Sequence, residues 1–195
     1  MHIAVDLDDS SLDTLTAVLL YYNQKHGTFL KRENFFVYRF NEVWGGTLQE
    51  AINEMGEFYL SEYFEKITPM PDSERTLRLL HEDGHKLSVV TGREPFLSEK
   101  TEKCIEKYFP GIFSGIYFAN TYGLTGTKMK KSEICIKNGV DLIIDDDLMH
   151  ISDCVDAQIP VLVYGNPWNE ISPKGSLRLK HWNEVLEIIR ILSSV

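Results

Sequence analysis

Three aspartates follow the first apolar run of the chain, in the segment Asp6-Leu7-Asp8-Asp9-Ser10. Asp6 and Asp8 are separated by one residue, so at the end of an extended strand their side chains can point to the same side. Carboxylates this close repel one another, and a divalent cation would offset that repulsion. The alternative is an ordinary strand end followed by an acidic helix N-cap, which needs no metal.

A second acidic cluster ends a later apolar run, in the segment Ile143-Ile144-Asp145-Asp146-Asp147. The carboxyl ends of parallel strands share one edge of a sheet, so we expect the two clusters to face each other unless their likeness is a coincidence. Carboxylate oxygens with water are ligands that suit Mg²⁺. The pattern predicts a magnesium site near Asp6 and Asp8 that includes Asp145 or Asp146.

Side chains that could hold a phosphate group follow another apolar run, which ends in Thr91-Gly92-Arg93. The Thr91 hydroxyl and the unobstructed Gly92 N–H could both donate to a phosphate oxygen; the alternative is an ordinary turn. Lys128, Lys130 and Lys131 precede an expected helix. Lys131, at the helix start, is the preferred phosphate contact, and a solvated basic turn is the alternative.

The chain alternates between short apolar runs and helical patterns. Runs such as Leu142–Ile144 and Val161–Val163 do not alternate with polar residues, which is typical of strands buried on both faces of a parallel sheet. The expected strands are His2–Val5, Lys86–Val90, Gly115–Phe118, Leu142–Ile144 and Pro160–Tyr164. The expected helices are Asp72–Asp83, Ser98–Tyr108, Lys131–Asn138 and His181–Leu192. This alternation predicts an α/β fold with a doubly wound parallel sheet.

A long insertion interrupts this pattern between the first and second expected strands. It is far longer than a crossover helix requires. Apolar side chains at helical spacing predict at least three helices, including one with Leu12, Leu15 and Leu19 and another with Leu60 and Phe64. We expect a helical cap at residues 14–70, above the carboxyl ends of the strands, and an α/β core at residues 1–13 and 71–195.

The expected cap is rich in aromatic side chains, most of which must form its own small core. Trp44 is the best candidate for a substrate contact, because Gly45-Gly46 leaves room for a ligand or a hinge. Stacking of a nucleobase on an aromatic ring contributes ~1–3 kcal/mol. The segment Pro167–Asn169 follows the last expected strand and either lines the site or caps the sheet.

Composition excludes several classes of protein. The net charge of -9 argues against binding of long nucleic acids, which needs a basic face. No apolar run approaches the ~20 residues of a membrane span, and aspartates interrupt the only early apolar stretch, so we expect a cytoplasmic protein. Scattered histidines, with no Gly-x-Ser-x-Gly segment or P-loop, disfavour serine hydrolases and NTPases. The three cysteines lack metal spacing and are expected to be buried free thiols.

Together these motifs resemble the haloacid dehalogenase-like (HAD) superfamily of phosphatases. That superfamily has an Asp-x-Asp strand end, a Ser/Thr strand end, a lysine and an acidic pair, in this order. Within it the chain resembles the 5'(3')-deoxyribonucleotidase group, because of the helical insertion, the Asp145-Asp146 pair and the segments Asn41–Thr47 and Pro167–Asn169. The resemblance covers nearly the whole chain. It departs from the common pattern at Asp9, where glycine is usual.

The resemblance implies a Rossmann-type HAD core and a hydrolase of small phosphomonoesters. Asp6 would be the nucleophile that forms an aspartyl-phosphate, and Asp8 the general acid and base. Mg²⁺ would be bound by Asp6, the backbone carbonyl of Asp8, and Asp145 or Asp146. Thr91, Gly92 and Lys131 would hold the phosphate. The expected substrate is a nucleoside monophosphate. Another phosphorylated metabolite, or a catalytically idle binding protein, is the alternative, and the oligomeric state stays open.

Overall fold

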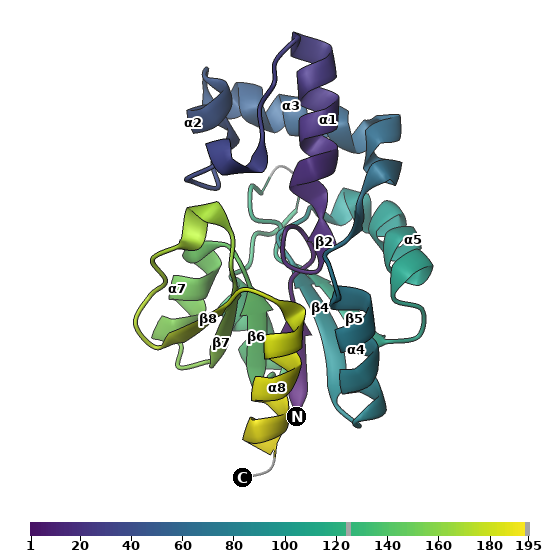
Figure 1. Ribbon diagram of the computed structural model, residues 1–195, viewed down its shortest axis with the longest axis vertical. Coiled ribbons are helices and arrows are strands. Elements are labelled where there is room, and N and C mark those ends of the chain that lie inside the picture. Colours follow the sequence, from purple (N-terminus) through teal and green to yellow (C-terminus); the bar gives the residue numbers. More distant parts are fainter. Residues whose placement is uncertain (124–125, 194–195) are drawn as a thin grey trace.

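A computed structural model describes residues 1–123 and 126–193 of the chain. At its centre lies a parallel sheet with the strand order β5-β4-β1-β6-β7-β8 (Figure 1). Its strands are β1 (His2–Val5), β4 (Lys86–Thr91), β5 (Phe113–Phe118), β6 (Leu142–Asp145), β7 (Val161–Tyr164) and β8 (Ser176–Leu179). Strand β1 is central, so the first acidic cluster emerges from the middle of the sheet. The predicted α/β class is confirmed.

The edge strand β8 was absent from the sequence prediction. Its sequence, Ser-Leu-Arg-Leu, alternates polar and apolar residues, and Leu177 is 45% exposed whereas Leu179 is buried. A strand at the edge of a sheet that is covered on one side loses the continuous apolar pattern of buried parallel strands. The five predicted strands are confirmed, with shifts of one or two residues at their ends.

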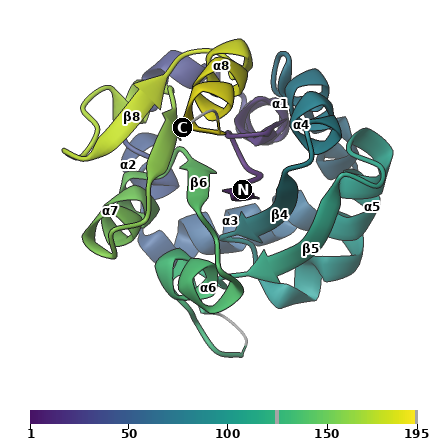
Figure 2. The ribbon, with the colours of Figure 1, turned by 90° about the horizontal axis from the view of Figure 1, so that it is seen from below.

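Helices cover both faces of the sheet (Figure 2). Side chains of alternate strand residues divide between two apolar clusters: Ile3 and Val5 pack with α4 (Ser73–Glu82), α5 (Ser98–Tyr108) and α8 (Trp182–Ser193). Ala4 and Ile143 pack on the other face with α6 (Lys131–Asn138) and α7 (Leu148–Asp156). The four predicted helices are confirmed, and α7 is an addition. None of the helices in the described part of the chain is long and apolar enough to cross a membrane.

The insertion lies above the carboxyl ends of the strands (Figure 1). It contains α1 (Thr14–His26), η1 (Arg32–Asn34), α2 (Phe40–Trp44), α3 (Leu48–Leu60) and η2 (Glu62–Lys66), where η denotes a 3-10 helix. The chain enters it through β2 (Leu12–Asp13) and returns through β3 (Thr68–Pro69), which pair antiparallel. The division of the chain into a separate cap and core stays a prediction.

Two details of the insertion differ from the prediction. Leu12, expected on the first helix, lies in β2, because the chain pairs with β3 before the helix begins. Leu60, expected to open a third helix with Phe64, ends α3, and Phe64 lies in the short η2. Phe64 is nevertheless buried, as the apolar spacing predicted.

All three cysteines are buried and free, as predicted. Cys135 and Cys154 lie in the apolar cluster between the sheet and the α6–α7 layer, and Cys104 lies on α5 in the opposite layer. These thiols therefore act as small apolar side chains in the core.

Candidate active site

The strand order explains why residues far apart in the sequence meet above β1. Strand β1 pairs with β4 on one side and β6 on the other, with Val5 opposite both Val89 and Ile144. The backbone N–H of Asp6 continues this ladder and donates to the Ile144 carbonyl at 2.9 Å. The side chains that follow the three strands therefore gather at one edge of the sheet.

Lys131 links two of these strand ends. Its Nζ lies 2.7 Å from Asp6 Oδ1 and 2.7 Å from Asp145 Oδ2, and the whole side chain is 1% exposed. As the first residue of α6, Lys131 points back toward the sheet edge. The adjacent Lys130 is exposed and pairs with Asp153 on α7 instead. Of the neighbouring lysines, the structure brings Lys131 to the acidic residues.

Asp6, Asp145 and Asp146 form a buried acidic triad. Each offers a carboxylate oxygen, and these oxygens all lie within 4.8 Å of one another. Asp145 Oδ1 also accepts the backbone N–H groups of Asp146 at 2.9 Å and Asp147 at 3.1 Å. Three anionic oxygens at this spacing match the hard ligands that Mg²⁺ takes. The donor set therefore fits a divalent cation.

Asp146 is held in the triad by two side chains from other parts of the chain. Ser10 Oγ donates to Asp146 Oδ1 at 2.8 Å, and Trp168 Nε1 donates to Asp146 Oδ2 at 3.0 Å. The sequence left open whether Trp168 lines the site, and this hydrogen bond places it there. Ser10, to which the sequence gave no role, closes the triad from the side of β1.

The carboxylate of Asp8 lies outside the triad. It is bound by the guanidinium of Arg93, from Nε to Oδ2 at 2.8 Å and from Nη2 to Oδ1 at 2.7 Å. Thr14, the first residue of α1, donates to Oδ1 at 2.5 Å. Sequence reasoning placed Asp8 among the metal ligands through its backbone carbonyl, and this stays a prediction. It gave no role to Arg93, although the residue belongs to a motif that it quoted.

Thr91 and Gly92 lie at the end of β4, beside the acidic residues. The Thr91 hydroxyl is fully buried and accepts the Arg93 backbone N–H at 3.2 Å. A Cβ at Gly92 would lie 2.7 Å from Thr121 Oγ1, too close for any side chain without a shift of the loop. A larger residue here would force the Thr121 side chain to shift, which is a second reason for a glycine after Thr91.

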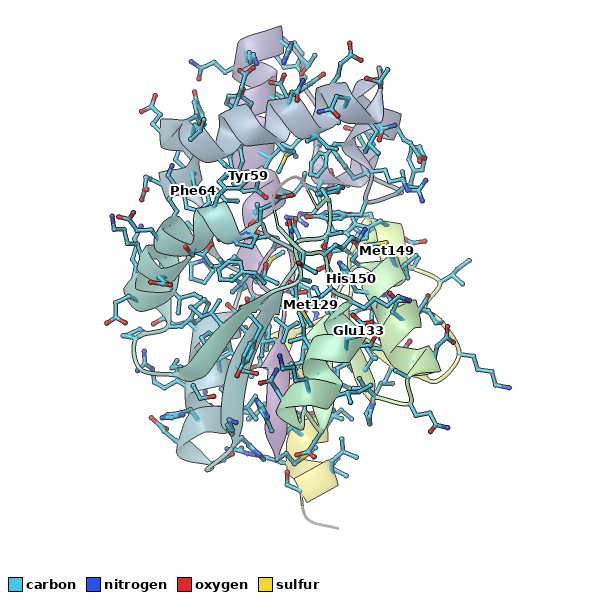
Figure 3. All side chains as sticks on the ribbon, turned by 180° about the vertical axis from the view of Figure 1, so that it is seen from behind. Tyr59, Phe64, Met129, Glu133, Met149 and His150 are labelled. Carbon is cyan, nitrogen blue, oxygen red and sulfur yellow. The ribbon has the colours of Figure 1, made fainter. Side chains whose placement is uncertain are left out.

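Trp44, the predicted substrate contact, packs inside the insertion. Its ring stacks on Tyr22 at 4.3 Å with an interplanar angle of 9°, and lies 4.7 Å from Phe40. Tyr59, at the end of α3, lies on the side of the insertion that faces the core (Figure 3). Burial and then the charge of Asp8 raise the pKa of the Tyr59 phenol. The spacing of residues in the sequence could not tell that Trp44 packs within the insertion and that Tyr59 faces the core.

Asp9 ties the insertion to the sheet edge. Its φ of 58° lies in the left-handed region, which explains why glycine is usual at this position. Its buried carboxylate accepts hydrogen bonds from Arg32 at 2.9 Å and Tyr38 at 2.9 Å, both in the insertion. Arg32 also donates to Asn166 at 2.9 Å. An aspartate tolerates this backbone conformation and here gains partners that glycine lacks.

Comparison with known proteins agrees with this geometry. Residues 1–194 match the family described as 5' nucleotidase, deoxy (pyrimidine), cytosolic type C protein. The chain belongs to this family. It is therefore a HAD-type phosphatase of the nucleotidase kind, whose substrate is a small phosphorylated molecule. The membership confirms the resemblance that the motifs indicated.

Relatives of this nucleotidase-family chain align over nearly all of its length. A Bacillus cereus protein, named provisionally as a nucleotidase, is 23% identical over 97% of this chain and 98% of its own. A predicted phosphatase from Clostridium acetobutylicum has a TM-score of 0.73 at 15% identity, covering 97% of this chain and 98% of the other. A HAD family hydrolase from Deinococcus radiodurans, solved with phosphate and sodium, has a TM-score of 0.68 at 13% identity, covering 98% and 96%.

In this protein, burial and neighbouring charges shift the pKa values of Asp6 and Asp146 in the acidic triad. Burial raises the pKa of Asp6 to about 8, and the charges of Asp145 and Asp8 add to the rise, against the opposing effect of Lys131. Burial and the charge of Asp6 also raise the pKa of Asp146. Asp8 behaves in the opposite way: burial would raise its pKa, but Arg93 and Thr14 hold it below its usual value.

The raised pKa of Asp6 predicts that the stability of the metal-free protein depends on pH. Asp6 binds its proton more tightly in the folded state, so its contribution is full below the unfolded pKa of 3.8 and is lost as pH rises through about 8. We expect the free energy of unfolding, measured by urea titration in chelator, to fall over this window. Asp6→Asn should flatten the fall and stabilise the metal-free protein at alkaline pH. A wild-type profile that rises toward pH 8 would contradict this reading.

Proposed function

We propose that the protein is a magnesium-dependent phosphomonoester hydrolase that acts through an aspartyl-phosphate on Asp6, with nucleoside 5'-monophosphates as substrates. One observation carries the proposal: the Asp6 carboxylate lies between a buried lysine and two further buried carboxylates. Such a group combines a nucleophile with a cationic neighbour for phosphate and a donor set for a metal. We also propose a cytoplasmic location, which agrees with the word "cytosolic" in the family description.

In the first step a carboxylate oxygen of Asp6 attacks the phosphorus, and the bond from phosphorus to the leaving oxygen breaks. Asp8 gives a proton to that oxygen, so the alcohol leaves neutral. In the second step Asp8 takes a proton from a water molecule, which attacks the phosphorus and releases Asp6. The contacts of Asp8 with Arg93 favour its ionised form, the form that this second step uses.

The phosphate oxygens would be held by Lys131, Thr91 and the Gly92 N–H. In the described part of the chain, Lys131 Nζ donates to Asp6 and Asp145, so one of its three N–H groups remains for phosphate. A cation buried next to the nucleophile stabilises the charge that develops on the transferring group. Closure of the insertion over this edge would exclude bulk water until the phosphoenzyme has formed.

Asp6, Asp145 and Asp146 would bind Mg²⁺ together with the backbone carbonyl of Asp8. Their oxygens lie within 4.8 Å of one another and are buried. Burial, and then the charge of neighbouring carboxylates, raises the pKa of Asp6 and Asp146, and a divalent cation would favour their ionised forms. The cation supplies positive charge that aligns the phosphate with Asp6 and offsets the charge on the reacting oxygens.

Nucleoside monophosphates are favoured as substrates by the family and by the aromatic surroundings of the site. The Tyr38 hydroxyl donates to Asp9 at 2.9 Å, so this ring lies at the sheet edge that carries the acidic residues. A flat ring face near the phosphate site can stack a nucleobase. The name of the Bacillus cereus relative points to the same class of substrate.

A substrate panel tests the proposed function. Deoxyribonucleoside and ribonucleoside monophosphates, sugar phosphates and 4-nitrophenyl phosphate would be compared with Mg²⁺ and with excess chelator, measuring released phosphate. We expect the highest kcat/KM for a nucleoside monophosphate and no turnover in chelator. A preference for sugar phosphates would show that nucleoside monophosphates are not the substrates. Full activity in chelator would show that the reaction needs no divalent metal. The absence of turnover for every compound would indicate a protein that binds a ligand without hydrolysing it.

The metal ligands can be tested with two aspartates of the segment Asp145-Asp146-Asp147. Asp145→Asn removes a charged member of the triad, and we expect the Mg²⁺ concentration for half-maximal activity to rise at least about 10-fold. Asp147→Asn is the matched control, because the Asp147 carboxylate accepts the Met149 N–H at the start of α7 and does not belong to the triad. An equal rise for both variants would show that the loss of charge near the site, and not ligation, sets the metal requirement.

A further inference from the structure

Arg93 makes its strongest contacts with the side chain that is proposed to transfer protons. Two of its nitrogens bind the two oxygens of Asp8 in a fork, and its own side chain is fully buried. A guanidinium presents its N–H groups in one rigid plane, so this pairing fixes the plane of the carboxylate as well as its position. A lysine would supply the charge without fixing the orientation.

The hydrogen bonds leave the two oxygens of Asp8 in different states. Within the described residues, Oδ1 accepts from both Arg93 Nη2 and Thr14 Oγ1, which uses both of its lone pairs. Oδ2 accepts only from Arg93 Nε, so one lone pair stays available. Oδ2 is therefore the oxygen that can exchange a proton with a leaving group or a water molecule.

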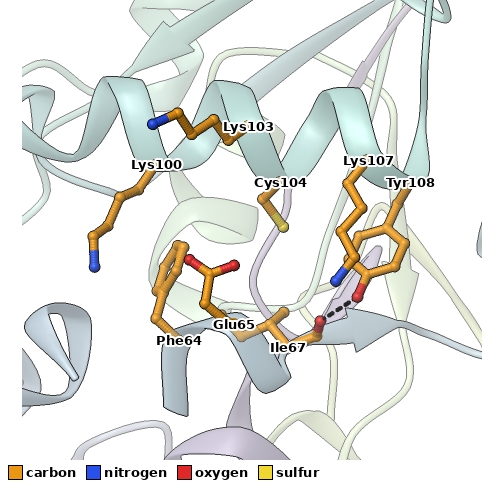
Figure 4. A pocket seen from close by; sticks show the side chains of 8 residues that line it. All are labelled: Phe64, Glu65, Ile67, Lys100, Lys103, Cys104, Lys107 and Tyr108. Atoms are coloured by element: carbon orange, nitrogen blue, oxygen red, sulfur yellow. Dashed lines mark hydrogen bonds between the residues drawn. The ribbon is translucent and has the colours of Figure 1, made fainter. Parts of the chain in front are cut away.

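Arg93 is itself anchored on the side away from Asp8. Its Nη1 donates to Thr101 Oγ1 on α5 at 3.1 Å, and its guanidinium lies 5.3 Å from the ring centre of Phe64 in η2. Phe64 and Cys104 then line a small cavity between η2 and α5 (Figure 4). With its nitrogens engaged by Asp8 and Thr101, Arg93 is placed as a fixed support for Asp8 and not as a mobile clamp for phosphate.

We propose that Arg93 is a positioning residue that holds the Asp8 carboxylate in the orientation from which Oδ2 transfers protons. The inference rests on the proposed function, because it needs Asp8 as general acid and base. Arg93 does not touch the substrate; it acts through Asp8. Thr101 supports it from α5, and Phe64 covers its guanidinium from the insertion.

Two phosphate esters of similar shape separate this role from others. Benzyl phosphate has a poor leaving group that needs a proton, whereas 4-nitrophenyl phosphate has a good one that does not. Single-turnover rates would be measured for wild type and Arg93→Lys, with inhibition by inorganic phosphate. We expect Arg93→Lys to lower the rate of benzyl alcohol release about 100-fold, the lower limit for a general acid. The nitrophenolate burst should stay close to wild type, and phosphate should inhibit both proteins equally.

Further variants keep the test independent of folding. Thr101→Val retains the guanidinium and removes one anchor, so we expect a smaller loss that is again confined to benzyl phosphate. If Arg93→Lys does not fold, this variant decides the question. Lys103→Gln, on the exposed side of the same helix, is the charge control and should change neither rate.

Two outcomes would overturn the inference. Equal losses for both esters with weaker inhibition by phosphate would make Arg93 a phosphate ligand. Wild-type rates in Arg93→Lys with both esters would show that a positive charge suffices and that Asp8 needs no fixed orientation. If Arg93→Lys does not fold, wild-type rates in Thr101→Val would show the same. A wild-type protein that hydrolyses neither ester would contradict the proposed function itself, which is a separate result.

Discussion

Replacing Asp6 with asparagine should lower phosphatase turnover by at least about 10⁴-fold without unfolding the protein. The amide has nearly the shape of the carboxylate but is a poor nucleophile, so no aspartyl-phosphate can form. Asp6 is 5% exposed and contacts Lys131, and the substitution should not force its neighbours apart. The measurement is Mg²⁺-supported turnover of 4-nitrophenyl phosphate, with circular dichroism to confirm the fold.

The control for Asp6→Asn is another aspartate-to-asparagine change at the opposite edge of the sheet. Asp141 accepts the His2 backbone N–H at 2.7 Å where β1 and β6 begin, whereas both acidic clusters lie at the carboxyl ends of these strands. Asp141→Asn should keep wild-type turnover. Labelled phosphate should be trapped on wild-type protein by rapid acid quench and be absent from Asp6→Asn. If Asp6→Asn turned over substrate at the wild-type rate, the covalent mechanism would be wrong.

Removing the charge of Lys131 should produce the largest loss of stability. Lys131→Met leaves Asp6 and Asp145 without the cation that lies 2.7 Å from each. Breaking a buried ion pair by removing one partner costs about 3–5 kcal/mol, because the remaining charge stays buried without compensation. We expect this loss in the free energy of unfolding, measured by urea titration at neutral pH in chelator, together with a large loss of turnover.

Lys130→Met is the matched control for Lys131→Met, because it removes the adjacent lysine. Lys130 is exposed and its pair with Asp153 lies at the surface, where such pairs contribute about 0–1 kcal/mol. Added Mg²⁺ should recover part of the stability of Lys131→Met, since the cation can take over the neutralisation of the triad. Equal stability of the two variants would show that the Lys131 charge is not needed between the carboxylates.

The sequence predicted the core of the fold because buried parallel strands carry a strong signal. The runs that became β6 and β7 are continuous and apolar, which suits strands covered on both faces. Strand β8 was missed because its edge position leaves polar residues in its pattern. The segment η2 was predicted as part of a longer helix, because apolar spacing over one turn does not distinguish a 3-10 helix from an α-helix.

The candidate site divides in a similar way. Asp6, Thr91, Lys131 and Asp145 could be named from the sequence, because each stands at the end of a predicted element that the strand order brings to one edge. Tertiary packing alone decided which basic side chain pairs with which carboxylate. Lys131 pairs with Asp6 and Asp145, whereas the Asp8 carboxylate is turned away from them toward Arg93.

The partners of Asp9 and Asp146 were likewise outside the reach of the sequence. Tyr38 and Trp168 lie 29 and 22 positions away in sequence from the aspartates that they contact. Local periodicity cannot predict contacts between residues so far apart in the sequence, because they depend on how the insertion and the last strands fold back over β1. The sequence by itself thus determined the nucleophile candidate and the acidic groups around it. The tertiary structure decided the orientation of Asp8, because it depends on packing between segments far apart in the chain.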